Sequence, residues 1–506
     1  MIDPVELQVL TGALRAICEE MGAVLIRSAH SANIKERRDA STALFDPAGE
    51  MLMQAEHIPV HLGAMPAAIE AILDENQAPD RAWVLNDPYR GGTHLPDVTV
   101  IVPVFAPADD DDEAEELIAF AANRAHHADI GGPTPGSMPA DSRTLADEGV
   151  VIDPRVLDEQ AIAELSQRLR QPEQRRADLR AQLAAGRAGA RRLGELYRRV
   201  GGDKLKEAFT EVLDYAERRT RACLEQLEDG MLEARDALEG REGDLAIVLE
   251  ATVEGDHLRL DFTGTAPQHE GNLNCPIAVT RSACYFAIRV LTDPEIPPSA
   301  GAYRPIEVVA PEGCLLNARS PTGRPEDAPA VVGGNVETSS RVADVVLRAF
   351  GRALGQGTMN NITLGSEDVV YYETIAGGQG ACPDADGPSA VHVAMSNTLN
   401  TPVEALELEF PISVREYSVR RGSGGEGAHH GGDGVVRELE ALAPLRYSLI
   451  TERRRHPPPG ANGGGDGAPG RNLLDGEELD AKAIGELRPG QRLRIETPGG
   501  GGYGAA

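Results

Sequence analysis

The chain has 506 residues, of which 41% are hydrophobic, a composition typical of a globular protein and too apolar for a disordered one. This length exceeds what one hydrophobic core supports, so several domains are expected. The formal net charge of −31 argues against nucleic acid and against anionic membrane surfaces as partners.

Features that direct a chain to a compartment are scarce. The first residues lack the basic start and apolar run of a signal peptide. No stretch of about 18 apolar residues is present that could span a membrane. The six cysteines stand singly, with no CxxC pair, so neither a zinc knuckle nor a disulfide scaffold is predicted. We therefore expect a cytoplasmic protein.

Residues 1–154 are predicted to form an α/β region. Asp3-Pro4 is typical of a helix start, and the spacing of the following leucines indicates a helix over 4–29. A glycine-containing turn between 41–46 and 51–53 predicts a β-hairpin. A second helix is expected at 67–78, and further strands are expected at 83–88, 98–105 and 117–122.

Three further regions differ in composition. Residues 155–240 are rich in Arg, Glu, Ala and Leu and are predicted to be helical, with a break at Gly201-Gly202. Residues 241–355 begin with an alternating pattern that predicts a hairpin. Residues 356–506 are rich in strands and glycine. Helices are expected at 276–292 and 336–354, and irregular structure is expected at 457–470.

The expected fold class is therefore α+β. It combines several domains, mixed sheets, a central helical segment and a strand-rich C-terminal region.

Two dense polar clusters, at 91–97 and 123–132, contain three of the twelve histidines and two aspartates. Imidazole and carboxylate are ligands that suit a divalent transition metal. Both clusters contain glycine pairs, where a missing side chain lets a backbone or a ligand approach closely. The alternative is a polar network in which the histidines only tie two loops together.

The positions inside the clusters narrow the candidate ligands. Pro96 excludes a helix interior, so His94 and Asp97 are expected on a loop or at the start of a strand. Strand alternation sends His126 and His127 to opposite faces, so only one of them is expected to join the other two residues. A His-Asp-His set leaves positions open for water or substrate, as a catalytic metal needs.

Other polar residues are candidates for catalysis. His57 and His61 are four residues apart, but Pro59 excludes the helical zinc-binding arrangement, which leaves proton transfer or a hydrogen-bonded turn. Asp39 ends an Arg-Arg-Asp sequence that suits either carboxylate or phosphate binding, or a surface ion-pair cluster. The predicted catalytic set is Asp39, His57, His61 and His127.

Nucleotide-binding motifs are absent from the sequence. It has neither a Walker A motif nor a GxGxxG motif between a strand and a helix. If ATP is used, we expect a partner to bind it.

Long motifs run along the chain: NIKERRD at 33–39, EHIPVHLG at 56–63, GGTHLPD at 91–97 and AHHADIGG at 125–132. Further motifs lie at 86–89, 135–139, 271–274, 333–338, 356–361 and 497–501. Together they closely resemble the hydantoinase B/5-oxoprolinase family over essentially the whole chain. The main departure is the acidic run at 109–116, which resembles an insertion at a loop tip.

The resemblance implies the B-type subunit of an ATP-dependent amidohydrolase. Members work with a hydantoinase A-type partner, which binds ATP and phosphorylates a cyclic amide such as a hydantoin or 5-oxoproline. The B-type subunit then completes ring opening.

The resemblance also implies a metal. The related acetone carboxylase alpha subunit carries a manganese site, and its ligand pattern matches His94, Asp97 and one of His126 and His127. We choose His126. The expected cofactor is a divalent metal, manganese in the first place, with zinc or another ion as the alternative, while ATP is expected on the partner.

Two other functions are compatible with the sequence. An acetone-carboxylase-like alpha subunit would join a phosphorylated ketone enolate to carbon dioxide. A scaffold subunit without catalytic function would use its histidine clusters only for structure.

Overall fold

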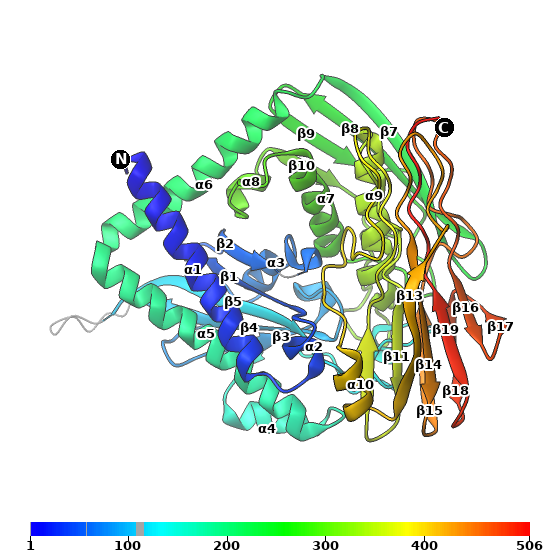
Figure 1. The fold of residues 1–506 in the computed structure, drawn as a ribbon. Helices are drawn as coiled ribbons and strands as arrows, with labels where there is room; N and C mark the ends of the chain where they lie inside the picture. Colours follow the sequence, from blue (N-terminus) through cyan, green and yellow to red (C-terminus); the bar gives the residue numbers. More distant parts are fainter. Residues whose placement is uncertain (1, 57, 108–115, 506) are drawn as a thin grey trace.

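The computed structural model describes residues 2–56, 58–107 and 116–505 (Figure 1). Within these residues, four sheets and the helices around them form a mixed fold, which confirms the predicted α+β class. The predicted insertion at 109–116 lies outside the described residues except for Glu116. His57 also lies outside them.

A six-stranded sheet forms the centre of the N-terminal region. Its strand order is β2-β1-β5-β4-β3-β6, and helix α1 (Pro4–Ser28) packs on it, with Asp3 as its N-cap. The strands are β1 (Ala40–Phe45), β2 (Met51–Glu56), β3 (Trp83–Leu85), β4 (Asp97–Phe105), β5 (Leu117–His126) and β6 (Arg155–Val156). The predicted helix and hairpin are confirmed.

Two elements of this region differ from the prediction. Strand β5 continues to His126 instead of ending at 122, because its last residues pair with β1 on one side and with β4 on the other. Helix α3 (Met65–Glu70) is shorter than predicted. After Glu70 the chain continues in turns closed by hydrogen bonds between residues three apart. One example is the hydrogen bond from Glu75 N–H to Ile72 C=O.

Three helices follow this sheet in the sequence, and the longest of them, α5, packs against β4 and β5, as Figure 1 shows. They are α4 (Glu159–Gln167), α5 (Pro172–Val200) and α6 (Gly202–Leu224). Gly201 separates α5 from α6 with a φ of +88°, which confirms the predicted break. The helical prediction was wrong at its end, since Gly230–Glu239 form strand β7 and pair with the next strand.

The third region contains a four-stranded sheet of order β10-β9-β8-β7. Its remaining strands are β8 (Asp244–Glu254), β9 (His257–Asp261) and β10 (Ile306–Val309), and the helices are α7 (Ile277–Leu291), α8 (Ala300–Tyr303) and α9 (Ser339–Ala349). A π-helical turn, η4 (Gly334–Thr338), leads into α9. The predicted helix at 336–354 ends at 349 because Gly351, at a φ of +62°, and Arg352 donate back to the last turn of α9.

Two sheets pack face to face in the C-terminal region. One has the order β12-β11-β15-β18 and the other the order β13-β14-β19-β16-β17. The first contains β11 (Asn361–Gly365), β12 (Val370–Glu373), β15 (Leu445–Ile450) and β18 (Lys482–Leu487). The second contains β13 (Ile412–Arg420), β14 (Gly434–Ala441), β16 (Arg471–Leu474), β17 (Glu477–Leu479) and β19 (Arg492–Glu496), and helix α10 (Val403–Glu409) precedes it. Residues 457–470 form neither helix nor strand, as predicted.

One hydrophobic core joins these regions. It runs from Phe120 in the N-terminal sheet through Leu238 of β7 and Val342 of α9 to Tyr372 and Ile450 of the C-terminal sheet. This core crosses the predicted domain boundaries at 154, 240 and 355, which stay predictions. None of the described helices is long and apolar enough to cross a membrane.

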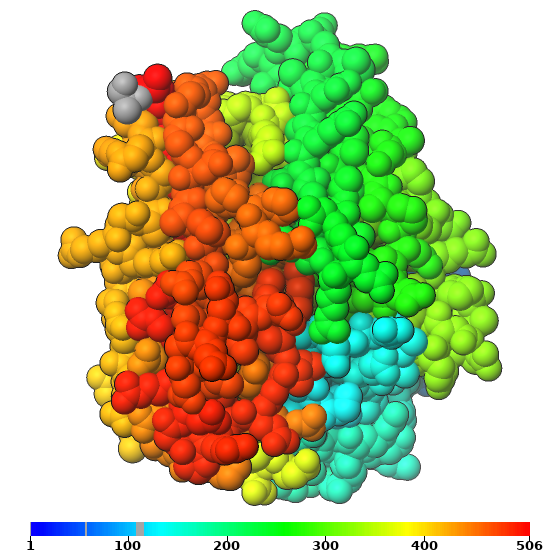
Figure 2. Space-filling model, turned by 90° about the vertical axis from the view of Figure 1, so that its right-hand side faces the viewer, coloured from blue at the N-terminus to red at the C-terminus, as the bar shows by residue number. Residues whose placement is uncertain are grey.

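A buried ion network holds the C-terminal sheets against β7. The Lys482 ammonium donates to the carboxylate of Glu452 and to the backbone carbonyl of Glu239. Arg341 of α9 lies 3.5 Å from the same carboxylate, and it also pairs with Asp236 at 3.2 Å. Figure 2 shows the orange and red C-terminal segment lying against the green segment around β7. This network connects segments that are far apart in the sequence.

Replacing Lys482 by methionine should destabilise the fold. The substitution leaves the fully buried Glu452 carboxylate without its ammonium partner, and breaking such a pair costs about 3–5 kcal/mol of the free energy of unfolding. Urea unfolding measures this loss. The matched control is Arg259→Met, which removes an exposed pair with Glu307 and should leave the unfolding midpoint unchanged. Equal effects of the two substitutions would contradict the structural role of the network.

Candidate metal centre

Asp97 and His126 are cross-strand partners. Asp97 is the first residue of β4 and His126 is the last residue of β5, and the antiparallel register places them directly opposite each other. His126 donates its backbone N–H to the carbonyl of Asp39, just before β1. Three adjacent strands therefore fix the position of these two side chains at one end of the sheet.

A tight loop brings His94 to this pair. Asp87 caps a short 3-10 helix at Pro88–Arg90, and Gly91 then turns the chain with a φ of +94°. A Cβ atom at Gly91 would lie 2.4 Å from the backbone oxygen of Ala67, so the loop accepts no side chain there. The buried guanidinium of Arg124 donates to the Gly91 carbonyl at 2.6 Å and ties this loop to β5.

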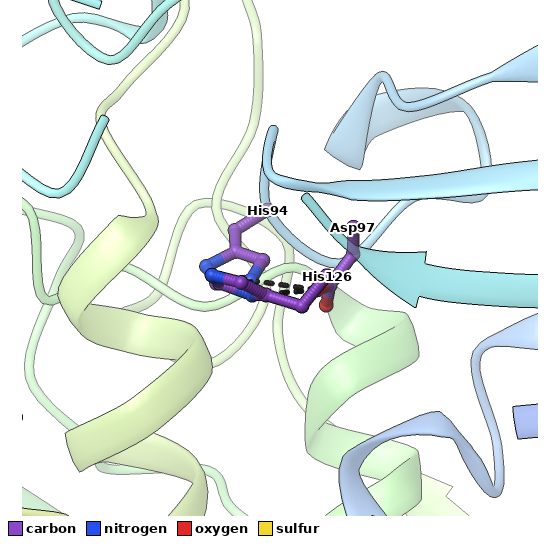
Figure 3. A group of neighbouring side chains, drawn as sticks. All are labelled: His94, Asp97 and His126. Atoms are coloured by element: carbon purple, nitrogen blue, oxygen red, sulfur yellow. Dashed lines mark hydrogen bonds and ion pairs between the residues drawn. The ribbon is translucent and has the colours of Figure 1, made fainter. Parts of the chain in front are cut away.

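The three side chains converge on one point, as Figure 3 shows. Asp97 Oδ1 lies 2.9 Å from His94 Nε2 and 3.1 Å from His126 Nδ1. The two imidazole nitrogens are 3.2 Å apart. All three residues are buried, with at most 2% of their surface exposed.

The other oxygen of the Asp97 carboxylate is held separately. Thr93 Oγ1 donates to Asp97 Oδ2 at 2.5 Å, and His61 Nε2 lies 3.4 Å from the same oxygen. His61 Nδ1 in turn lies 2.9 Å from Ser41 Oγ, which fixes the ring. Because these contacts hold Oδ2, the Oδ1 atom of Asp97 faces the imidazoles of His94 and His126.

Electrostatics favour a carboxylate at Asp97 and a neutral imidazole at His126. Burial alone would raise the pKa of Asp97, but the charge of His94 and the hydrogen bonds from the surrounding histidines outweigh it and hold that pKa well below its usual range. Burial lowers the pKa of His126, against the opposing effect of Asp97 and Asp39. These are the protonation states that metal ligands need.

The donor set fits a bound cation. Three atoms with lone pairs face one another. The far nitrogens, His94 Nδ1 and His126 Nε2, have no hydrogen-bond partner within the part of the chain that the structure describes. At metal–ligand bonds of about 2.1 Å, donor atoms at right angles lie about 3.0 Å apart, and donors at a tetrahedral angle lie about 3.4 Å apart. The observed separations of 2.9–3.2 Å lie close to this range, so one ion could contact all three donor atoms.

Tyr372 closes the centre from the C-terminal sheet. Its ring stacks on His126, with centroids 4.6 Å apart and planes 15° apart. The Arg37 guanidinium lies 4.6 Å from the centre of the Tyr372 ring and donates to Thr374 at 3.1 Å. Arg37 is fully buried, with Asp39 at 3.9 Å. The centre therefore lies between the N-terminal sheet and the first C-terminal sheet.

The structure separates the two adjacent histidines, as strand alternation predicted. His126 joins His94 and Asp97, whereas His127 Nε2 contacts the Gln182 side chain of helix α5 at 2.9 Å. The structure also brings His61 and Asp39 close to the three residues. His57 lies outside the described residues.

Four residues around the centre were missed as site residues. Thr93 and Arg124 lie inside the two polar clusters, so their sequence position was a usable signal. Arg37 was noted only as part of a polar sequence. Tyr372 carried no signal, since it belongs to an apolar strand far along the chain from His126.

Comparison with known proteins identifies a matching family and several similar proteins. A family model described as hydantoinase B/oxoprolinase matches residues 3–506. 5-Oxoprolinase 1 of Arabidopsis thaliana is 38% identical, with 99% of this chain and 42% of the plant protein covered. A protein of a Pseudomonas species, provisionally named as the B-type subunit of a D-/L-hydantoinase, is 31% identical, with 99% of this chain and 90% of that protein covered. The chain thus spans less than half the length of its plant relative.

Two solved structures share the fold. The ATP-dependent caprolactamase from Pseudomonas jessenii superposes with a TM-score of 0.90 at 28% identity, covering 100% of this chain and 92% of that chain. The nucleotide-free structure of acetone carboxylase superposes with a TM-score of 0.86 at 17% identity, covering 99% of this chain and 76% of that chain. The second likeness concerns the fold alone.

The loop that carries His94 should not tolerate a side chain at Gly91. Gly91→Ala combines a left-handed backbone, which costs about 1–2 kcal/mol, with a clash against Ala67, which adds about 1–3 kcal/mol. The matched control is Gly201→Ala, because Gly201 has a similar φ of +88° but no heavy atom within 4 Å of the added Cβ. Urea unfolding should therefore show a larger loss for Gly91→Ala. Equal losses would mean that the close approach to Ala67 is not required.

Proposed function

This chain belongs to the hydantoinase B/oxoprolinase family, and we propose that it is the B-type subunit of an ATP-dependent enzyme that opens a cyclic amide such as 5-oxoproline or a hydantoin. The observation that carries the proposal is the buried cluster of His94, Asp97 and His126, in a chain whose relatives include a 5-oxoprolinase and a caprolactamase. A metal ion held by this cluster would supply the chemistry that amide hydrolysis needs.

We propose an A-type subunit as the partner that binds ATP. The Pseudomonas hydantoinase relative has about the length of this chain, whereas the plant 5-oxoprolinase is more than twice as long. The longer relative has room for a second functional part in one polypeptide. On this proposal the partner phosphorylates the cyclic amide, and the present chain completes ring opening.

We propose that His94 Nε2, Asp97 Oδ1 and His126 Nδ1 hold a divalent metal, with manganese as the first candidate and zinc as the alternative. Such an ion supplies Lewis-acid polarisation of a carbonyl oxygen and activation of water. The mixed donor set supports these two candidates, because imidazole suits zinc and carboxylate suits manganese.

The surrounding residues have separate roles in this proposal. Thr93 and His61 hold the second oxygen of Asp97, so that the first oxygen stays directed at the cluster. His61 is thus a positioning residue, and His57 stays a prediction for proton transfer. Asp39 holds His126 in place, because its backbone carbonyl accepts the His126 N–H. His127 supports the site indirectly, since it ties the end of β5 to helix α5.

Carboxylation and a scaffold role are the two alternatives that experiments can distinguish from hydrolysis. The similarity to acetone carboxylase concerns the fold, so a carboxylation activity is supported less than hydrolysis. A scaffold subunit would need no convergence of three buried ligand atoms.

Metal analysis tests the ligands. We expect the purified chain to bind close to one equivalent of metal, and His94→Ala, Asp97→Ala or His126→Ala to lower the bound metal at least about tenfold, because each removes one of three protein ligands. His127→Ala is the matched control, since it removes the neighbouring imidazole and should retain the metal. Elemental analysis after dialysis gives the content. Equal metal content in His94→Ala and in the unmodified chain would show that His94 is not a ligand.

The reaction is tested in the complex with an A-type subunit. We expect ATP-dependent opening of 5-oxoproline, hydantoin or caprolactam by the complex and by neither subunit alone, measured as release of the ring-opened product and of phosphate. His126→Ala should abolish product release, because the cluster acts on the activated amide. Bicarbonate-dependent consumption of a ketone would support the carboxylase instead, and absence of both reactions would support a scaffold.

A further inference from the structure

We infer that Asn361 recognises the amide edge of the substrate, an inference that rests on the proposed function. Asn361 is the first residue of β11 and is 2% exposed. Among the described residues, neither its side-chain Nδ2 nor its Oδ1 has a hydrogen-bond partner. Leaving both polar atoms of a buried carboxamide unpaired is costly, so a ligand that pairs with both is the expected explanation.

Strand register places Asn361 beside the metal centre. Strands β11 and β12 are antiparallel, with Thr363 opposite Tyr372. Asn361 precedes Thr363 by two residues, so its side chain lies on the same face of the sheet and diagonal to Tyr372. That face is turned toward the centre, because the Tyr372 ring stacks on His126. Asn361 therefore approaches the centre from the C-terminal sheet.

The neighbouring residues confirm which face Asn361 occupies. Ile362, next in the strand, packs in the core between the two C-terminal sheets and so faces the other way. Ile450, the cross-strand partner of Asn361 on β15, belongs to the core that joins the N-terminal and C-terminal regions. The carboxamide is thus directed at the space between these regions, where the centre lies.

The chemistry of a carboxamide matches a ring amide. The ring holds the amide in the cis form, so the nitrogen and the carbonyl oxygen lie on one edge. Phosphorylation of the ring oxygen breaks no bond to the ring nitrogen, so the N–H stays on the cationic phosphorylated amide. Asn361 Oδ1 accepts from this N–H, and Nδ2 donates to the oxygen on the same ring carbon. Two parallel hydrogen bonds of this kind fix the orientation of the amide plane.

A second buried asparagine differs from Asn361 in its hydrogen bonding. Asn472 on β16 is fully buried, and its carboxamide is satisfied within the protein. Its Nδ2 donates to Thr451 Oγ1 at 3.0 Å, and its Oδ1 accepts from Arg454 at 2.7 Å. Asn472 thus has partners on both of its side-chain polar atoms, unlike Asn361.

The test is Asn361→Leu in the complex with the A-type subunit. For whichever of 5-oxoproline, hydantoin and caprolactam the unmodified complex opens, kcat/KM should fall roughly tenfold for each lost hydrogen bond, or roughly a hundredfold in total. The thermal midpoint of the variant should equal or exceed that of the unmodified chain, because no internal hydrogen bond is lost. The substrate should also raise that midpoint in the unmodified complex and not in the variant.

Asn472→Leu is the matched control, with the opposite pattern expected. It breaks internal hydrogen bonds, so the thermal midpoint should fall while kcat/KM of the folded fraction is unchanged. The inference is overturned if Asn361→Leu keeps full kcat/KM, or if it lowers the midpoint as Asn472→Leu does. An unmodified complex that opens none of the three amides would instead overturn the proposed function, and the inference with it.

Discussion

The antiparallel register between β4 and β5 is the constraint on which the site depends. It sets Asp97 opposite His126 at the end of both strands, and this pairing holds only while the register of the two strands is kept. A shift of one strand by one residue would turn its side chain to the other face of the sheet and so separate Asp97 from His126. The loop with Gly91 and the Arg124 guanidinium then bring His94 to a position that the strands have already fixed.

The strand register fixes the position of the Asp97 carboxylate, and the charge of this group must be balanced inside the protein. One oxygen is held by Thr93 and His61, and the other faces two imidazoles. Because the group is buried, its charge is costly unless donors or a cation surround it. The protein supplies donors on one side only, and the remaining side is where a metal ion would complete the balance of charge.

Burial also explains why the centre needs the C-terminal half of the chain. Tyr372 and Arg37 close the space next to His126, and the strand that carries Tyr372 brings Asn361 to the same face. The carboxamide left unpaired there lowers stability, whereas the ion network around Glu452 holds the same regions together with several contacts. An unpaired carboxamide facing the centre, in a scaffold that an ion network holds together, is the arrangement expected of a binding site.

Local patterns in the sequence determined the α+β class, the first helix and hairpin, and the candidate ligands. Pro96 excluded a helix at His94, and alternation placed His126 and His127 on opposite faces, so a few neighbouring residues carried this information. The tertiary structure alone decided which of the two histidines joins Asp97, because that choice depends on the pairing of β4 with β5. It alone placed Tyr372 and Asn361 at the centre, since contacts between segments more than two hundred residues apart leave no periodicity in the sequence. For the same reason the composition of 230–239 predicts a helix where β7 forms, since strand pairing with β8 outweighs the helical preference of these residues.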